Sequence, residues 1–147
     1  MITIDKELLI SDRCEFGTLF NNLNLMGYGL EIGVFEGIFS ETLRNKWKGK
    51  TLHLVDRWVH DNGYIDVSNK SNEEFEEMFL NVNKKFLHDP SVITHRMLSL
   101  DASRLFSDNF FDWIYIDADH SYDACSNDLR NWYNKLKSVE FILDMIT

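Results

Sequence analysis

Three residues that can do chemistry lie close together after the apolar run 111–116: Asp117, Asp119 and His120. Carboxylate oxygens are the ligands that a hard divalent cation such as Mg2+ prefers, and a histidine can accept a proton near neutral pH. We therefore predict Asp117 and Asp119 as candidate metal ligands and His120 as a candidate general base. The alternative interpretation is that Asp119 or Ser121 caps the following helix and that His120 is an exposed loop residue.

A second group lies further toward the N-terminus, in the pattern Glu31-x-Gly33-x-x-x-Gly37. Glycine lets the backbone approach a ligand closely and turn tightly into a helix. The pattern is not the G-x-G-x-x-G of dinucleotide-binding proteins, and an ordinary strand-to-helix turn would also explain it. Asp56 ends the next apolar run, about 20 residues on, where nucleotide-binding folds place an acid that accepts the ribose hydroxyls. Together the two features predict a ligand that contains a nucleoside.

A third group, Ser99-Leu100-Asp101-Ala102, follows the apolar run 91–97. Asp101 can accept a hydrogen bond from the exocyclic amine of adenine, and the backbone amides beside it can face the ring. The alternative is that Ser99 or Asp101 only caps the short helix that follows.

The elements that position these residues alternate between strand-like and helix-like patterns. Continuous apolar runs predict strands over 30–35, 51–55, 91–97 and 111–116. Helical spacing predicts helices over 12–24, 37–47 and 100–106, from 121 onward, and from a capping box at Ser71–Glu74. Buried strands that alternate with helices indicate an α/β fold, a Rossmann-like doubly wound parallel sheet. Such sheets bind ligands at the carboxyl ends of their strands, which is where the three groups lie.

Length and charge limit the possible functions. The chain has 147 residues, enough for a single domain. Its net charge is −9, from 15 basic and 24 acidic residues, which argues against a protein that binds nucleic acid through its phosphates. The sequence lacks an apolar run long enough to cross a membrane and a recognisable leader, so we expect a cytoplasmic protein without a membrane partner.

Four motifs in order give the sequence a family resemblance. They are Glu31-x-Gly33-x-x-x-Gly37, Leu54-Val55-Asp56-Arg57-Trp58, Ser99-Leu100-Asp101-Ala102 and Phe111-Asp112-Trp113-Ile114-Tyr115-Ile116-Asp117-Ala118-Asp119-His120-Ser121-Tyr122. The sequence resembles a class I S-adenosylmethionine-dependent methyltransferase, and it is most similar to the small-molecule O-methyltransferase branch. The resemblance covers residues 29 to 137. It implies methyl transfer to a small-molecule acceptor, with a hydroxyl as the expected acceptor group.

The resemblance also implies residue roles. Glu31 and the backbone of Gly33 would hold the methionine part of S-adenosyl-L-methionine, and Asp56 would hold the ribose. Asp101 and Ala102 would flank the adenine. In metal-dependent relatives the position of Asp117 ligates a divalent cation, usually magnesium, and the position of His120 can serve as the base. The full set assigned to the cofactor is Glu31, Gly33, Val34, Phe35, Gly37, Asp56, Arg57, Ser99, Asp101, Ala102 and Asp117.

The resemblance divides the chain into an N-terminal helical segment (1–28), a cofactor-binding core (29–137) and an aberrant tail (138–147). The tail can be encoded by codons that, read in a shifted frame, give the strand and the Gly-His-Asp-Tyr sequence expected in the family. We therefore expect a frameshift that truncates the sheet after about the fourth or fifth strand. Such a truncation predicts weak or absent activity, and the uncovered surfaces could lead to a homo-oligomer.

Two other classes of protein fit parts of the sequence. One is a nicotinamide-binding Rossmann domain, against which stand the missing G-x-G-x-x-G pattern and the acid two residues before Gly33. The other is an inactive, truncated fragment that binds the cofactor without catalysing a reaction. The loop 57–70 and the N-terminal helix are expected to form the walls of the acceptor pocket, with Trp58, His60, Asp61, Tyr64 and Asp66 giving it polar character.

Overall fold

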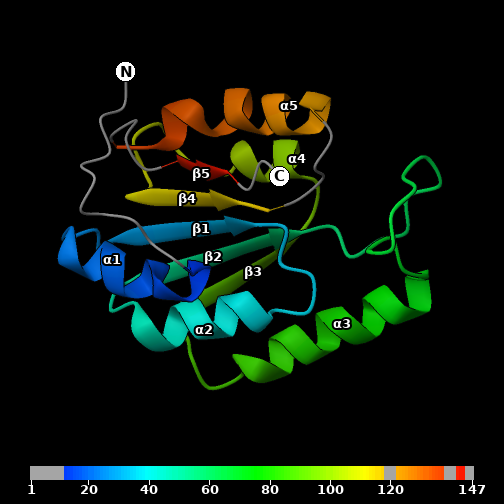
Figure 1. Cartoon of the computed structure of the whole chain (residues 1–147), viewed down its shortest axis with the longest axis horizontal. Helices are drawn as coiled ribbons and strands as arrows, with labels where there is room; N and C mark the ends of the chain where they lie inside the picture. Colours follow the sequence, from blue (N-terminus) through cyan, green and yellow to red (C-terminus); the bar gives the residue numbers. More distant parts are fainter. Residues whose placement is uncertain (1–11, 118–121, 138–141, 145–147) are drawn as a thin grey trace.

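A computed structural model describes residues 12–117, 122–137 and 142–144 of the chain. The elements run in the order η1 (Arg13–Glu15), α1 (Phe16–Asn22), β1 (Tyr28–Ile32), α2 (Ile38–Lys46), β2 (Thr51–Asp56), α3 (Asn72–Lys85), β3 (Val92–Arg96), α4 (Ser99–Ser103), β4 (Trp113–Ile116), α5 (Tyr122–Trp132), η2 (Tyr133–Lys135) and β5 (Ile142–Asp144). The strands form one sheet in the order β3-β2-β1-β4-β5, and each neighbouring pair is parallel (Figure 1).

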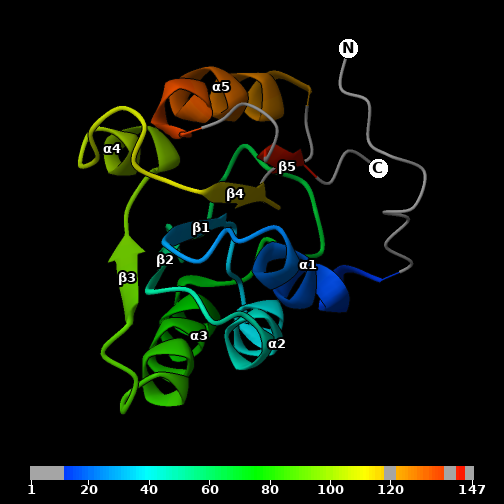
Figure 2. The same cartoon turned by 90° about the vertical axis from the view of Figure 1, so that its left-hand side faces the viewer.

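Helices cover both faces of the sheet. The helices α1, α2 and α3 lie on one face, and α4 and α5 lie on the other (Figures 1 and 2). Side chains alternate along each strand, so β4 sends Trp113 and Tyr115 into one apolar cluster and Ile114 and Ile116 into the other. The prediction of a doubly wound parallel sheet is confirmed.

The core beneath α1 and α2 is built around the ring of Trp113. This ring stacks on Phe20, with centroids 4.5 Å apart, and meets Trp47 edge-on at 5.0 Å. Gly29 lies opposite Trp113 in the register of β1 and β4. A Cβ atom at Gly29 would lie 2.1 Å from the Trp113 ring, so the glycine provides the space that the indole fills.

Several predicted boundaries move for local reasons. The strand predicted over 30–35 ends at Ile32, because Gly33 takes a positive φ of 87° and begins the turn toward α2. The helix predicted over 12–24 is divided into the 3-10 turn η1, capped by Asp12, and α1. The capping box of α3 is confirmed: Ser71 accepts from the Glu74 amide, and the Glu74 carboxylate accepts from the Ser71 amide.

The final strand lies within the segment predicted as an aberrant tail. β5 pairs in parallel with β4 at the edge of the sheet, through Ile142, Leu143 and Asp144. Part of the segment 138–147 thus completes the observed sheet, while the frameshift itself stays a prediction about the gene. None of the described helices has the length and apolar character needed to cross a bilayer.

Candidate functional site

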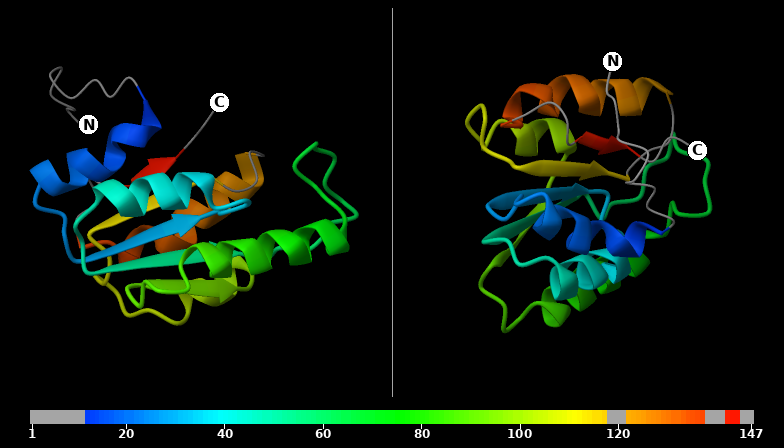
Figure 3. Two further views of the ribbon diagram at one scale, coloured as in Figure 1. Left: turned by 90° about the horizontal axis from the view of Figure 1, so that it is seen from below. Right: turned by 60° about the vertical axis from the view of Figure 1, so that its left-hand side comes forward.

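A cavity of about 530 Å³ opens at the carboxyl ends of the strands. This is where an open α/β sheet is expected to bind a ligand. The cavity brings together eight of the residues predicted for the cofactor: Glu31, Gly33, Val34, Phe35, Asp56, Arg57, Ser99 and Asp117. The loop after β2 extends beyond this edge of the sheet (Figure 3).

Asp56 fixes the loop that follows β1. Its Oδ2 accepts hydrogen bonds from the amides of Val34 and Phe35, both at 2.9 Å. Its Oδ1 accepts from the Trp58 amide, also at 2.9 Å. Phe35 takes a positive φ of 55°, which is uncommon for a bulky residue, and these bonds help to hold it there. A carboxylate offers about four acceptor positions, so one on Oδ1 remains for a ligand hydroxyl.

Trp58 supports the same loop from the core. Its side chain is only 1% exposed, packs on Phe79, and donates from the indole nitrogen to the Phe35 carbonyl at 2.9 Å. The prediction that Trp58 lines the acceptor pocket is therefore wrong. Its backbone takes a positive φ of 47°, which turns the chain back toward the core directly after Asp56.

Glu31 places a buried carboxyl group at the floor of the cavity. The residue is 1% exposed, and the Ser40 hydroxyl donates to its Oε2 at 2.6 Å. The pKa of Glu31 is raised to about 8, chiefly by burial and also by the nearby carboxylates of Asp117 and Asp56, against the opposing effects of Ser40 and Arg13. A cation bound beside this group would favour its ionised form.

Arg13, from the N-terminal segment, also lines the cavity, and no sequence pattern predicts it. Its guanidinium donates to Asp117 Oδ2 at 3.0 Å and lies 5.1 Å from the centroid of the Phe39 ring. The Tyr115 hydroxyl, more than the Asp117 carboxylate, raises the pKa of Arg13. A basic residue in an irregular segment carries no spacing signal, so only the docking of the segment reveals it.

The residues predicted to bind a metal or act as the base are only partly described. Asp117 lies at the cavity and pairs with Arg13. Asp119 and His120 lie outside the described residues, and their roles stay predictions. Among residues 12–117, 122–137 and 142–144, no three His, Cys, Asp or Glu side chains come together in a group that could hold a metal ion. The described residues therefore do not support the predicted Mg2+ site.

Three of the predicted cofactor residues do not reach the cavity. Ala102 is fully buried in the core under α4, and Asp101 points to solvent and pairs with Arg104 at 3.2 Å. Gly37 begins α2 with a positive φ of 74°, and its missing Cβ makes room for Val82. The prediction that Asp101 and Ala102 flank the adenine is not supported, because α4 already begins at Ser99 and turns Ala102 inward.

Two apolar residues line the part of the cavity next to α4. Met97 and Leu98 precede α4 and line the cavity together with Ser99. The Ser99 hydroxyl donates to Asp128 and accepts from the Trp132 indole at 2.8 Å, so it ties α4 to α5. Met97 and Leu98 are thus the candidates for an apolar ring contact.

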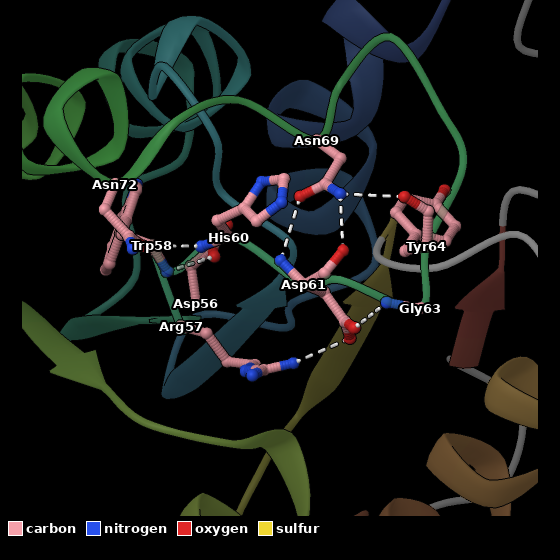
Figure 4. Close-up of polar contacts among 9 residues, drawn as sticks. All are labelled: Asp56, Arg57, Trp58, His60, Asp61, Gly63, Tyr64, Asn69 and Asn72. Carbon is pink, nitrogen blue, oxygen red and sulfur yellow. Dashed lines mark hydrogen bonds and ion pairs between the residues drawn. The ribbon is translucent and has the colours of Figure 1, made fainter.

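The loop after β2 is held together by Asn69 (Figure 4). The Asn69 side-chain oxygen accepts from the Asp61 amide at 3.0 Å, and its nitrogen donates to the carbonyls of Asp61 and Tyr64 at 2.6 and 2.7 Å. Arg57 pairs with Asp61 at 3.2 Å. These bonds hold the loop together, and its residues Asp61 and Tyr64 line the cavity; their contact with an acceptor stays a prediction.

His60 binds the loop to α3 rather than to the cavity. Its ring Nδ1 lies 2.9 Å from the Lys70 carbonyl, and its amide donates to the Asn72 side chain at 2.9 Å. His60 does not line the cavity as the structure describes it.

Acidic side chains outnumber basic ones along the cavity. Five acidic residues line it, Glu31, Glu36, Asp56, Asp61 and Asp117, against the two arginines Arg13 and Arg57. The parallel sheet, the glycine turn after β1 and the acid at the end of β2 are typical of Rossmann-like folds. A methyltransferase-domain family matches residues 30–143, and the chain belongs to this family.

Solved structures show the same fold. A protein from Staphylococcus aureus described as a caffeoyl-CoA O-methyltransferase aligns with a TM-score of 0.65 and 15% identity over 95% of this chain and 60% of that one. A Klebsiella pneumoniae protein described as an O-methyltransferase aligns with a TM-score of 0.60 and 18% identity, over 87% and 52%. The Podospora anserina methyltransferase PaMTH1, solved with S-adenosylhomocysteine, aligns with a TM-score of 0.60 and 14% identity, over 92% and 53%.

The chain therefore spans between about half and three fifths of the length of these three proteins. No curated protein matches it in sequence.

Proposed function

We propose that this protein binds S-adenosyl-L-methionine and transfers its methyl group to a hydroxyl of a small molecule. The observation that carries the proposal is the cavity at the carboxyl edge, where Glu31, the Gly33 turn and Asp56 meet in a fold of the methyltransferase-domain family. The neighbours described as O-methyltransferases support oxygen as the acceptor atom.

Different residues of the cavity would bind different parts of the cofactor. Asp56 would accept from a ribose hydroxyl through the remaining position on Oδ1, while its other bonds keep the loop after β1 in place. Met97 and Leu98 would pack on the adenine ring. Glu31 would lose its proton and pair with the ammonium group of the methionine part.

When bound, S-adenosyl-L-methionine supplies a methyl group activated by the sulfonium sulfur. The acceptor displaces the sulfur from the methyl carbon, and the protein contributes mainly by aligning the donor with the acceptor. A hydroxyl acceptor must also lose its proton, and we propose His120 as the base that takes it. Asp61 and Tyr64, fixed by Asn69, would contact a polar acceptor. The acidic charge supports a small-molecule acceptor over nucleic acid, and we propose a cytoplasmic location.

The test is transfer of an isotopically labelled methyl group. The protein is incubated with labelled S-adenosylmethionine and a metabolite extract, and the products are separated by mass spectrometry into small molecules, protein and nucleic acid. Label on an oxygen of a small molecule, lost in Asp56→Ala, supports the proposal. Label in nucleic acid or protein, or no label despite cofactor binding, contradicts it.

A further inference from the structure

An acidic and a basic side chain lie at one end of the cavity. Glu31 lies on β1, and its neighbour in the sheet register is Tyr115 on β4. Arg13 comes from η1 and faces Tyr115 and Asp117 at the same edge. The positive charge of Arg13 lowers the pKa of Glu31. Both side chains line the cavity.

This pair of charges is complementary to an α-amino acid group, which carries an ammonium and a carboxylate on one carbon. Glu31 is suited to the ammonium and Arg13 to the carboxylate. A guanidinium has five N–H donors in a rigid plane, so a bond to Asp117 and proximity to Tyr115 leave donors for a ligand. The contacts with Asp117 and the Phe39 ring also hold the side chain in position before the ligand arrives, which reduces the entropy lost on binding.

We propose that Arg13 binds the carboxylate of the methionine part and so selects nucleosides that carry the amino acid over nucleosides that lack it. The inference rests on the proposed function, but it assigns a specificity role to a residue outside the range 30–143 that the family matches. The N-terminal segment thereby becomes part of the cofactor site.

A different role for Arg13 would give a different result. If Arg13 only neutralised Asp117 and closed the edge of the sheet, its removal would weaken every nucleoside ligand to a similar degree. Two probes separate the cases: S-adenosylhomocysteine carries the amino acid, and 5′-methylthioadenosine has the same adenine, ribose and thioether sulfur without it.

The experiment is calorimetric titration of the full chain with each probe. We expect Arg13→Ala to weaken S-adenosylhomocysteine on the order of 10- to 100-fold, as for loss of a charge-assisted hydrogen bond. The affinity for 5′-methylthioadenosine should change less than about 2-fold, the scale of a site left intact. Arg13→Lys keeps the charge without the planar fork and should give an intermediate loss for the first probe alone. Arg130→Ala, which removes an exposed arginine on α5, is the matched control and should change neither affinity.

Equal weakening of both probes by Arg13→Ala, or no weakening of either, overturns the assignment to Arg13 while the proposed function stands. Failure of the unaltered chain to bind either probe removes the proposed function, and the inference with it. If Arg13→Ala fails to fold, as judged by circular dichroism, Arg13→Lys decides the matter by the same comparison.

Discussion

Binding of the cofactor should release a proton from Glu31. In the unliganded protein the buried carboxyl has a pKa of about 8, chiefly because burial disfavours its charge. At pH 7 it is therefore about nine-tenths protonated, whereas a bound ammonium group requires the ionised form. Between pH 6 and pH 7.5 the affinity for S-adenosylhomocysteine should rise about tenfold per pH unit and level off above pH 8.

The assay is calorimetry in two buffers that differ in ionisation enthalpy. The difference between the observed binding enthalpies should correspond to release of about 0.9 proton per ligand at pH 7. Glu31→Gln keeps an acceptor for the Ser40 hydroxyl, so it should preserve folding, abolish the proton release and lower the affinity above pH 8. Glu73→Gln on the exposed face of α3 is the control and should behave as the unaltered chain.

The raised pKa of Glu31 also predicts how the free energy of unfolding depends on pH. Its pKa is raised above the value of 4.5 that it has when exposed, so its contribution is fully present below that value and is lost as the pH rises toward 8. Between these limits the stability of the unliganded protein should fall by up to about 1.4 kcal/mol per pH unit from this group, and Glu31→Gln should remove the slope. An affinity that does not change with pH, together with no proton release, would refute the reasoning about Glu31.

Three further substitutions test other parts of the account. Asp56→Ala should weaken S-adenosylhomocysteine binding by on the order of 2–3 kcal/mol and lower the free energy of unfolding by about 1–3 kcal/mol, because the loop amides lose their acceptor; unchanged affinity in calorimetry would exclude the role. His120→Ala should lower turnover in the labelled-methyl assay without changing cofactor affinity, and an equal loss of both would indicate a structural role. Gly29→Ala should destabilise the fold by about 1–3 kcal/mol or more, because its Cβ meets the Trp113 ring, and a denaturation midpoint equal to that of the unaltered chain would contradict the packing described for this core.

The carboxyl-edge rule explains which site residues the sequence could predict. Glu31 and Asp56 lie in or at the end of apolar strands, and a parallel sheet brings such ends together whatever the details of the loops. Ala102 is buried and does not line the cavity, because α4 begins at Ser99 and turns this side chain toward the core. This orientation depends on packing that α5 supplies, through Ser99, Asp128 and Trp132.

The positions of Arg13 and Trp58 depend on tertiary contacts that local sequence patterns do not indicate. Arg13 becomes a cavity residue only because η1 docks over the end of β4, a contact between segments about 100 residues apart. Trp58 stands in a polar stretch that favours exposure, but one positive φ returns it to the core. Gly29 is a similar example, because its small size makes room for the Trp113 ring on the neighbouring strand and is not required by a turn in its own segment.

The most direct measurement of the central claim is calorimetric titration of the unaltered chain with S-adenosylhomocysteine and, separately, with NADH. We predict saturable binding of S-adenosylhomocysteine at one site, weakened in Asp56→Ala, and no binding of NADH. Binding of NADH without binding of S-adenosylhomocysteine would contradict the account and favour a nicotinamide-binding domain.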